Sequence, residues 1–427
     1  MEGVNSGEHS NASGSESEIP QKYDAIIAAA DDTSGSLTVG FELEVLFPTL
    51  PSEQAYDPHL SEHGVIYKGM RQGEFGEDFP DDEEETFDDW LLNLLRRMMP
   101  DEQLRAERDD DLFAPHDNIP HYDAWRVIDD FSLAYKETRP LFTPYGYYWV
   151  GREITSEVLN ADDRDTCAEK VTAICCALRQ ARVHLNDTTS VHVHVGRGDQ
   201  TFSLLTVKKF TTLLWFTDAK ILKLHHPSRQ NNEFCRPVVV DSVLALKSCE
   251  ELQGEEQNLD QGGLVQMREF LPEKAFEEAL LAAQLRRIWG SKDVEDIARL
   301  LTCADCAGGR GSVGFSRFLP AGKTGGNLHT FKWRQMAGCL DPVSIMRWLR
   351  VCVGFTNFAR LSPPVTFKTL ILAFVLIGEN FSGLDLIQAL ALDNEGVHFA
   401  KRLREYRLGE AELFQGESDG DLFLKPL

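Results

Sequence analysis

Positive charge is scarce in this sequence. Its 427 residues include 43 Lys and Arg against 68 Asp and Glu, which gives a formal net charge of −25. Residues 74–89 alone contain ten acids and no base, and the rest of the chain is acidic as well. Proteins that bind nucleic acids or anionic membranes carry basic patches that meet phosphate charge. The composition therefore argues against nucleic acid and against a membrane as the main partner.

Long apolar runs and a cysteine framework are also lacking. The longest apolar run, residues 370–377, is too short to span a bilayer. The first twenty residues contain neither a basic stretch nor an apolar segment, so we expect no signal peptide. The nine cysteines do not show the even spacing of a disulfide framework. We therefore expect reduced thiols and a cytoplasmic protein.

Enough apolar residues are present, 42%, to form a sizeable core. Strand-like and helix-like segments alternate without the regular βαβ rhythm of a parallel sheet. We expect an α+β fold with a curved, largely antiparallel sheet. The expected organisation is a disordered tail at 1–35, one domain at 36–410 with an acidic insertion at about 70–118, and a polar tail at 411–427.

Four of the expected strands have one apolar face and one polar face, because residues i and i+2 of a strand point the same way. The polar faces carry Glu42 and Glu44; Glu153 and Thr155; His192 and His194; and Thr330, Lys332 and Arg334. Taken singly, each pattern is more typical of a solvated sheet face than of a site. If the four strands pair in one sheet, their polar faces form a single concave surface.

The residue types on this surface favour one kind of ligand. Carboxylates and imidazoles without a matching excess of Lys or Arg suit a hard cation, Mg²⁺ or Mn²⁺. The planar guanidinium of Arg334 suits a phosphate oxygen. The pattern predicts a metal-dependent site that handles an anionic substrate.

Five segments recur in the order known from one family. They are "GFELE" at Gly40–Glu44, "GREITS" at Gly151–Ser156, "SVHVHVG" at Ser190–Gly196, "PSRQNN" at Pro227–Asn232 and "TFKWRQMAGCLD" at Thr330–Asp341. In these segments, over about residues 36–360, the sequence resembles the amidoligase family. These are carboxylate–amine ligases that share the fold of glutamine synthetase and glutamate–cysteine ligase.

The resemblance implies an activity and a set of roles. Such enzymes use ATP to phosphorylate a carboxylate, and an amine then displaces phosphate to give an amide or peptide bond. The substrates would be small-molecule or peptide carboxylates and amines, and the cofactors ATP with Mg²⁺ or Mn²⁺. The roles implied are one metal on Glu44 and Glu153, a second metal on Glu42 and His192, phosphate contacts from His194 and Arg334, and an anionic substrate group on Arg229.

Lys332 departs from the family pattern, which has Glu at this position. A protonated lysine cannot bind a metal ion, and its ammonium group would lie among carboxylates. The chain is therefore either a ligase that works with fewer metals or a catalytically impaired relative that binds or scaffolds. A metal-dependent hydrolase that uses the same Glu and His side chains is a poorer third hypothesis.

Three other motifs are better interpreted as structural features than as functional sites. "GRGSVG" at 309–314 follows no clear strand, so a flexible loop is preferred to a dinucleotide site. "AGKTGG" at 321–326 has Arg317 where a phosphate-binding loop needs its first glycine, and a surface loop or a flap over the site fits better. Cys303 and Cys306 have no second pair at zinc spacing.

Overall fold

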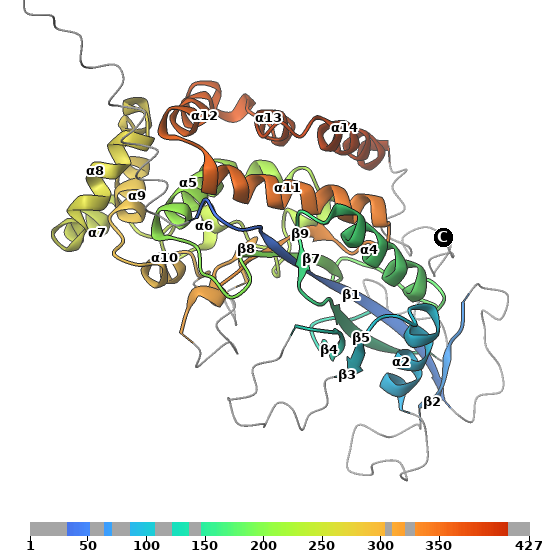
Figure 1. Cartoon of the computed structure of the whole chain (residues 1–427). Coiled ribbons are helices and arrows are strands. Elements are labelled where there is room, and N and C mark those ends of the chain that lie inside the picture. The colour runs from blue at the N-terminus through green and yellow to red at the C-terminus, as the bar shows by residue number, and fades with distance from the viewer. Residues whose placement is uncertain are drawn as a thin grey trace, which may run out of the picture.

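The computed structural model describes residues 32–51, 64–70, 86–106, 122–135, 147–303, 310–320 and 329–408. The centre of these residues is one nine-stranded sheet with the strand order β3-β4-β5-β1-β7-β9-β8, in which β2 and β6 also pair with β1 (Figure 1). The strands are β1 (Thr38–Pro51), β2 (Tyr67–Met70), β3 (Leu104–Ala106), β4 (Trp125–Asp129), β5 (Tyr148–Thr155), β6 (Leu159–Asn160), β7 (Ser190–Gly196), β8 (Val313–Gly314) and β9 (Phe331–Ala337).

The sheet is largely antiparallel, as the sequence predicts. Only the pairs β1–β2 and β3–β4 are parallel, and the other neighbours run in opposite directions. The strands form an open sheet that does not curl on itself, so the expected curvature is not a feature of the sheet. The fold is therefore a mixed α/β arrangement around an open, mostly antiparallel sheet.

One face of the sheet forms the core, as expected from the alternation of apolar residues along the strands. Leu43 and Val45 of β1, Val193 of β7 and Trp333 of β9 are at most 1% exposed. Two layers of helices cover this face (Figure 1). The inner layer contains α4 (Arg164–Leu178), α5 (Leu204–Leu222) and α11 (Pro342–Leu361), and the outer layer contains α12 (Pro364–Ile377), α13 (Gly383–Ala389) and α14 (Asp393–Leu408).

The inner helices begin where the sequence supplies capping groups. The Ser203 hydroxyl accepts a hydrogen bond from the Thr206 N–H at the start of α5, and the Asp341 carboxylate accepts two from the first turn of α11. Such N-caps satisfy backbone donors that the helix leaves unpaired. Phe210 of α5 stacks on Phe331 of β9 with ring centroids 3.7 Å apart, which fixes α5 against the sheet.

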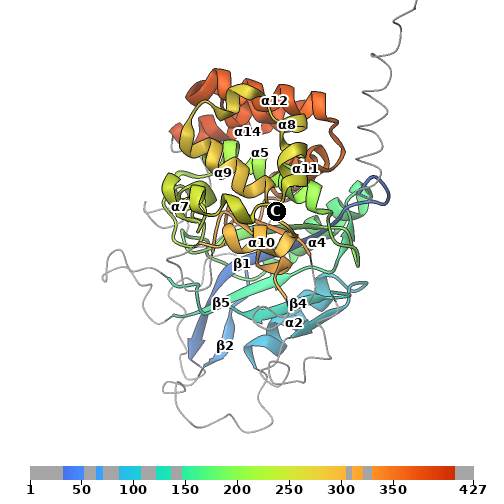
Figure 2. The same cartoon turned by 90° about the vertical axis from the view of Figure 1, so that its left-hand side faces the viewer.

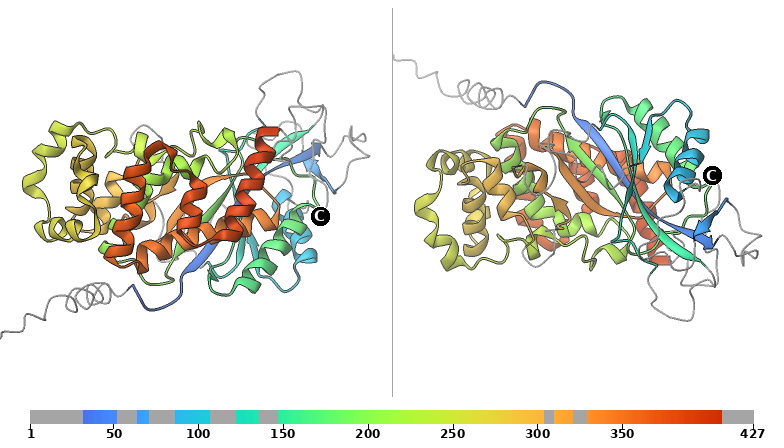
Figure 3. Two further views of the ribbon diagram at one scale, coloured as in Figure 1. Left: turned by 90° about the horizontal axis from the view of Figure 1, so that it is seen from above. Right: turned by 90° about the horizontal axis from the view of Figure 1, so that it is seen from below.

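Smaller helices lie at the two ends of the sheet. One group of helices lies beyond β8 in Figure 1 and faces the viewer in Figure 2. Its members include α7 (Cys249–Gly254), α8 (Gln261–Phe270), α9 (Ala279–Trp289) and α10 (Val294–Leu300). The short turns η1 (Pro227–Arg229) and α6 (Val238–Asp241) lead into this group. At the other end, α2 (Phe87–Met98) packs beside β2 and β3. Seen from below, the strands lie in front of the helical layers, so this is the polar face of the sheet (Figure 3, right).

Some segments and residues singled out in the sequence lie partly or wholly outside the described residues. These include most of the tail at 1–35, the acidic run up to residue 85, the segment 321–326, Cys306 and the tail at 411–427. Asp32 is described, and its buried carboxylate accepts a hydrogen bond from Arg197 at 2.8 Å. Within the expected acidic insertion, Leu91 and Leu95 of α2 belong to the core. The eight described cysteines form no disulfide, and no described helix is long and apolar enough to cross a membrane.

Candidate functional site

The pairing of the central strands places the polar side chains in adjacent rows. Glu42 of β1 lies opposite Thr155 of β5 and opposite His192 of β7. Glu44 lies opposite Glu153, and His194 lies opposite Lys332 of β9. The four strands predicted to share one polar surface therefore pair side by side, in the order β5-β1-β7-β9.

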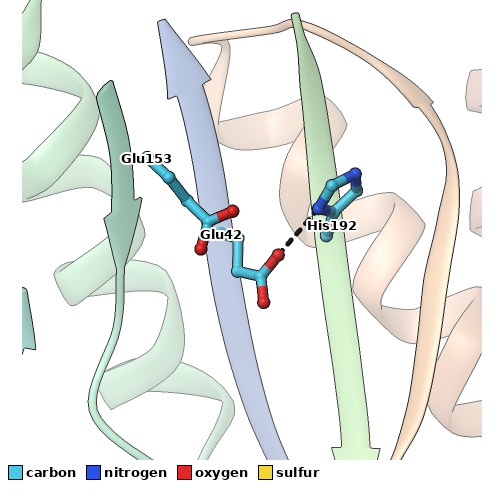
Figure 4. Close-up of side chains that lie close together, drawn as sticks. All are labelled: Glu42, Glu153 and His192. Atoms are coloured by element: carbon cyan, nitrogen blue, oxygen red, sulfur yellow. Dashed lines mark hydrogen bonds and ion pairs between the residues drawn. The ribbon is translucent and has the colours of Figure 1, made fainter. Parts of the chain in front are cut away.

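Three of these side chains point toward one another from three strands. Figure 4 shows Glu42, Glu153 and His192 converging from β1, β5 and β7. One possible ligand atom from each lies within 4.8 Å of the others. Glu42 and His192 are 5% and 2% exposed, so water contributes little to their solvation. The arrangement concentrates carboxylates and imidazole in a place of low dielectric.

Glu42 is the most heavily bonded residue of the site. Its Oε2 atom lies 2.7 Å from His192 Nδ1, and its Oε1 atom lies 2.7 Å from His194 Nε2. The Lys332 ammonium group also forms an ion pair with Oε2. Burial alone would raise the pKa of Glu42, but Lys332 and the two imidazoles hold it well below its usual range. Glu42 is therefore an ionised carboxylate whose two oxygens are both engaged.

The two histidines are neutral. Burial, helped by the charge of Lys332, lowers the pKa of His192 well below its usual range, and burial lowers that of His194 to about 4. A neutral His192 that donates from Nδ1 to Glu42 must accept a hydrogen bond at Nε2. Its Nε2 atom lies 2.7 Å from Ser190 Oγ, which fits that tautomer.

Ser190 then constrains the protonation state of Glu44. The Ser190 hydroxyl contacts both His192 Nε2 and Glu44 Oε2, but it has a single hydrogen to donate. If that hydrogen goes to His192, Glu44 must donate to Ser190 and must carry a proton. Burial and the nearby Asp130 carboxylate raise the pKa of Glu44 to about 7, although a hydrogen bond donated by Ser190 would lower it.

A second group of carboxylates lies beside the first. Oxygen atoms of Glu44, Asp130 and Glu153 lie within 4.8 Å of one another. Burial and the charge of Glu42 raise the pKa of Glu153 well above its usual range. Among the described residues, no Lys or Arg forms an ion pair with any of these three. Three converging carboxylates without a basic partner are the donor set that a hard divalent cation prefers.

Comparison with known protein families agrees with the residues at this face. Residues 36–262 match a family described as "Putative amidoligase enzyme". The chain belongs to this amidoligase family. No curated protein matches it. The matched region contains the carboxylates and both histidines of this amidoligase, whereas Lys332 and Arg334 lie beyond it. Family membership supports an amide-forming ligase as the general function.

The basic residues of the amidoligase lie at different depths. Arg334 is partly exposed, and its Nε atom has no hydrogen-bond partner among the described residues. Burial lowers the pKa of Arg334, while Glu42 and Glu44 oppose that effect. Arg229 is fully buried, and its Nη2 atom donates to the Arg334 carbonyl at 2.7 Å. Arg334 is thus placed to meet an anion, whereas Arg229 supports the backbone of β9.

A pocket continues the polar face beyond Glu42. Small residues at its base, including Gly40 and Gly196, leave room above the sheet. Tyr122 and Thr155 form part of its wall, and the buried Thr155 hydroxyl has no partner among the described residues. His194 lies between this pocket and Lys332, with its Nδ1 atom 3.1 Å from Thr330 Oγ1. Glu42 is one of the residues that line this pocket.

The structure therefore brings together most of the residues singled out from the sequence. Glu42, Glu44, Glu153, His192, His194, Lys332 and Arg334 lie on one face of adjacent strands. Sequence reasoning missed Asp130, which directly follows the last residue of β4, and Ser190, the first residue of β7. Asp130 has the parity of Arg126 and Ile128, which pair with Thr155 and Glu153 of β5, so alternation was an available signal for it. Ser190 shares the parity of His192 and His194, which was an available signal.

Proposed function

We propose that this amidoligase is an ATP-dependent carboxylate–amine ligase that forms an amide or peptide bond through an acyl phosphate. The observation that carries the proposal is the convergence of Glu44, Asp130 and Glu153 on a face that also carries Arg334, in a chain of this family. The substrates would be a small-molecule or peptide carboxylate and an amine. Enzymes of this reaction class would be expected to share a glutamine synthetase-like catalytic fold.

The reaction has two steps, and each needs positive charge at a defined place. In the first, a carboxylate oxygen of the substrate bonds to the γ-phosphorus of ATP and the bond to ADP breaks. In the second, the amine nitrogen bonds to the acyl carbon, phosphate leaves, and the nitrogen loses a proton. Negative charge develops on phosphoryl oxygens in both steps, and fixed cations stabilise it.

The donor set at Glu44, Asp130 and Glu153 fits Mg²⁺ or Mn²⁺, and these residues would hold it. When bound, the ion supplies positive charge against phosphate oxygens. Arg334 supplies a planar donor whose Nε atom is otherwise unpaired among the described residues. His194 has both ring nitrogens engaged, so it would reach a phosphate by giving up Glu42 or Thr330.

The amine needs a proton acceptor during the second step. Glu42 lines the adjoining pocket, but both its oxygens are engaged and its pKa is held well below the usual range, so it would act as a base only by giving up Lys332 or an imidazole. Tyr122 and Thr155 on the pocket wall would orient a ligand there. We assign the pocket to the reacting end of a substrate on these grounds.

The test is ATP turnover with panels of amino acids, peptides and amines. Purified protein with ATP and Mg²⁺ should release phosphate only when an acceptable acid is present, and hydroxylamine should trap the acyl phosphate as a hydroxamate. Arg334→Met should reduce turnover at least about 100-fold, as expected for loss of one oxyanion donor. Arg299→Met, on an exposed helix surface, is the matched control. Absence of ATP binding by calorimetry at every Mg²⁺ and Mn²⁺ level would refute the proposal.

A second candidate function is a non-catalytic relative that binds a nucleotide or metabolite. The ion pair between Lys332 and Glu42 favours it, because it neutralises a carboxylate at the centre of the site. Lys332→Glu separates the two functions. If the wild type is inert and the variant turns over ATP, the site is a degenerate one. If the wild type is active and the variant gains nothing, the lysine is an adaptation of a working ligase.

A further inference from the structure

The carboxylate of Glu42 has no free oxygen for a metal ion. His192 Nδ1 and Lys332 Nζ both contact Oε2, and His194 Nε2 contacts Oε1. His192 is also engaged at Nε2 by Ser190. A metal ion on Glu42 and His192 would have to displace an ammonium group and break hydrogen bonds to two imidazoles. The bonding around Glu42 therefore does not fit a divalent cation.

The neighbouring carboxylate group has the opposite property. Glu44, Asp130 and Glu153 converge, and none of them has a Lys or Arg ion-pair partner among the described residues. Glu153 belongs to both candidate ligand groups. An ion held by Glu44, Asp130 and Glu153 would leave only Glu42 and His192 for a second ion. Of that pair, Glu42 is already in an ion pair with Lys332.

We infer that the Lys332 ammonium group takes the place of a second divalent cation, so that this face binds one metal ion and one tethered cation. The ammonium group is a compact positive charge with three donors, and it neutralises Glu42 as a metal would. Lys332 is only 13% exposed at its side chain, which keeps this charge within the site. One of the site's positive charges is then supplied by a side chain of the protein, and no second metal ion is needed to supply it.

This inference deepens the proposed function, on which its meaning for catalysis rests. The number of bound ions, however, can be measured without ATP, substrate or turnover. If the ligase assay fails, the inference about the number of bound ions can still hold. If the number of bound ions is unexpected, the proposed ligase activity can still hold.

The experiment is a Mn²⁺ titration of the full chain, with free Mn²⁺ followed by electron paramagnetic resonance. The variants are Lys332→Glu and the matched control Lys223→Glu, which changes an exposed residue at the end of α5. Both variants have the same net charge and the same acidic run at 74–89, so weakly held ions cancel in the comparison. We expect Lys332→Glu to bind one more tightly held Mn²⁺ than Lys223→Glu. We also expect the variant's bound ions to show the spectral broadening of neighbouring spins.

Equal counts in the two variants would overturn the inference, as would two neighbouring Mn²⁺ ions in the wild type. Circular dichroism checks that each variant is folded. If Lys332→Glu does not fold, Lys332→Gln removes the ammonium group without adding a carboxylate. It should still bind one more Mn²⁺ than Lys223→Gln, and an equal count there would equally overturn the inference.

Discussion

Lys332 and Glu42 form an ion pair although their strands are not neighbours. Glu42 is on β1 and Lys332 is on β9, and β7 runs between them. Lys332 is paired in register with His194, so its side chain extends across β7 to reach the carboxylate. The contact joins three strands at the centre of the site, and it should stabilise the fold as well as shape the chemistry.

The first prediction concerns this ion pair. Lys332→Met should lower the free energy of unfolding by about 3–5 kcal/mol at pH 7, because it leaves a buried carboxylate without its cation. The folded-state pKa of Glu42 is depressed, so the stabilisation is present above the unfolded pKa and is lost as pH falls through the folded value. The difference from wild type, measured by urea unfolding without metal, should therefore shrink below about pH 4.5.

Lys401→Met is the control for that experiment. Its exposed pair with Glu405 spans one turn of α14, and such pairs contribute about 0.3–0.5 kcal/mol. A cost for Lys332→Met no larger than that of Lys401→Met would contradict the importance of the pair.

A second prediction concerns the pH dependence of Glu44. Its pKa is raised from 4.5 to about 7, so the folded state holds a proton that the unfolded state loses. The metal-free protein should lose stability as pH rises from about 4.5 to about 7, by up to about 3 kcal/mol. Glu44→Gln should remove this loss and be more stable than wild type above pH 7. Unfolding curves in chelator at several pH values measure it.

Two comparisons make the Glu44 experiment specific. Glu250 is exposed, so Glu250→Gln should leave the pH dependence of stability as it is in wild type. Added Mg²⁺ should restore stability to the wild type at pH 8 more than to Glu44→Gln, because the ion needs the ionised carboxylate. Parallel profiles for wild type and Glu44→Gln would show that Glu44 does not titrate in this range.

A third prediction concerns Asp130 as a metal ligand. Asp130→Asn should weaken the tightest Mn²⁺ site by at least the roughly 10- to 100-fold that loss of an outer-shell partner costs. Asp129→Asn is the matched control one residue earlier, where the carboxylate pairs with Arg152. Calorimetric titration of both variants gives the affinities. An unchanged affinity in Asp130→Asn would remove this residue from the site.

A fourth prediction concerns the serine that ends the "GREITS" segment. The Ser156 hydroxyl accepts a hydrogen bond from the Phe41 N–H at 2.9 Å and donates to the Glu157 carbonyl at 2.7 Å. Ser156→Ala should cost about 1–3 kcal/mol, because a buried backbone donor loses its partner. Thr155→Val should be nearly neutral, since the Thr155 hydroxyl has no partner among the described residues. Chemical denaturation compares the two, and equal costs would contradict this role.

The faces of individual strands could be predicted from the sequence because they depend only on local geometry. Alternation places Glu42 with Glu44 and His192 with His194, whatever the strands pair with. That rule identified Lys332 as a residue of the same surface. The amidoligase family, too, was evident from short segments of this kind.

Contacts between strands could not be predicted, because they depend on register and on side-chain reach. The family resemblance implied that the Lys332 ammonium group lies among carboxylates, but nothing local indicates that it reaches Glu42 across β7, or that Ser190 lies between Glu44 and His192. Asp130 is just past the end of β4, and its parity alone does not show that its carboxylate reaches those of Glu44 and Glu153. The openness of the sheet is likewise a property of the whole assembly of strands.

The irregular register between β7 and β9 has a consequence for chain length. Val191 pairs with Met336 and Val193 pairs with Trp333, so Arg334 and Gln335 both lie opposite His192. This bulge lets Trp333 and Met336 pair with valines of the same face although three positions separate them. Removing Gln335 would turn this bulge into regular pairing and would keep Trp333 and Met336 on the core face, because the two would then be two positions apart. Removing a residue elsewhere in β9 would exchange the core and site faces beyond it, so the strand tolerates a change of length best at this point.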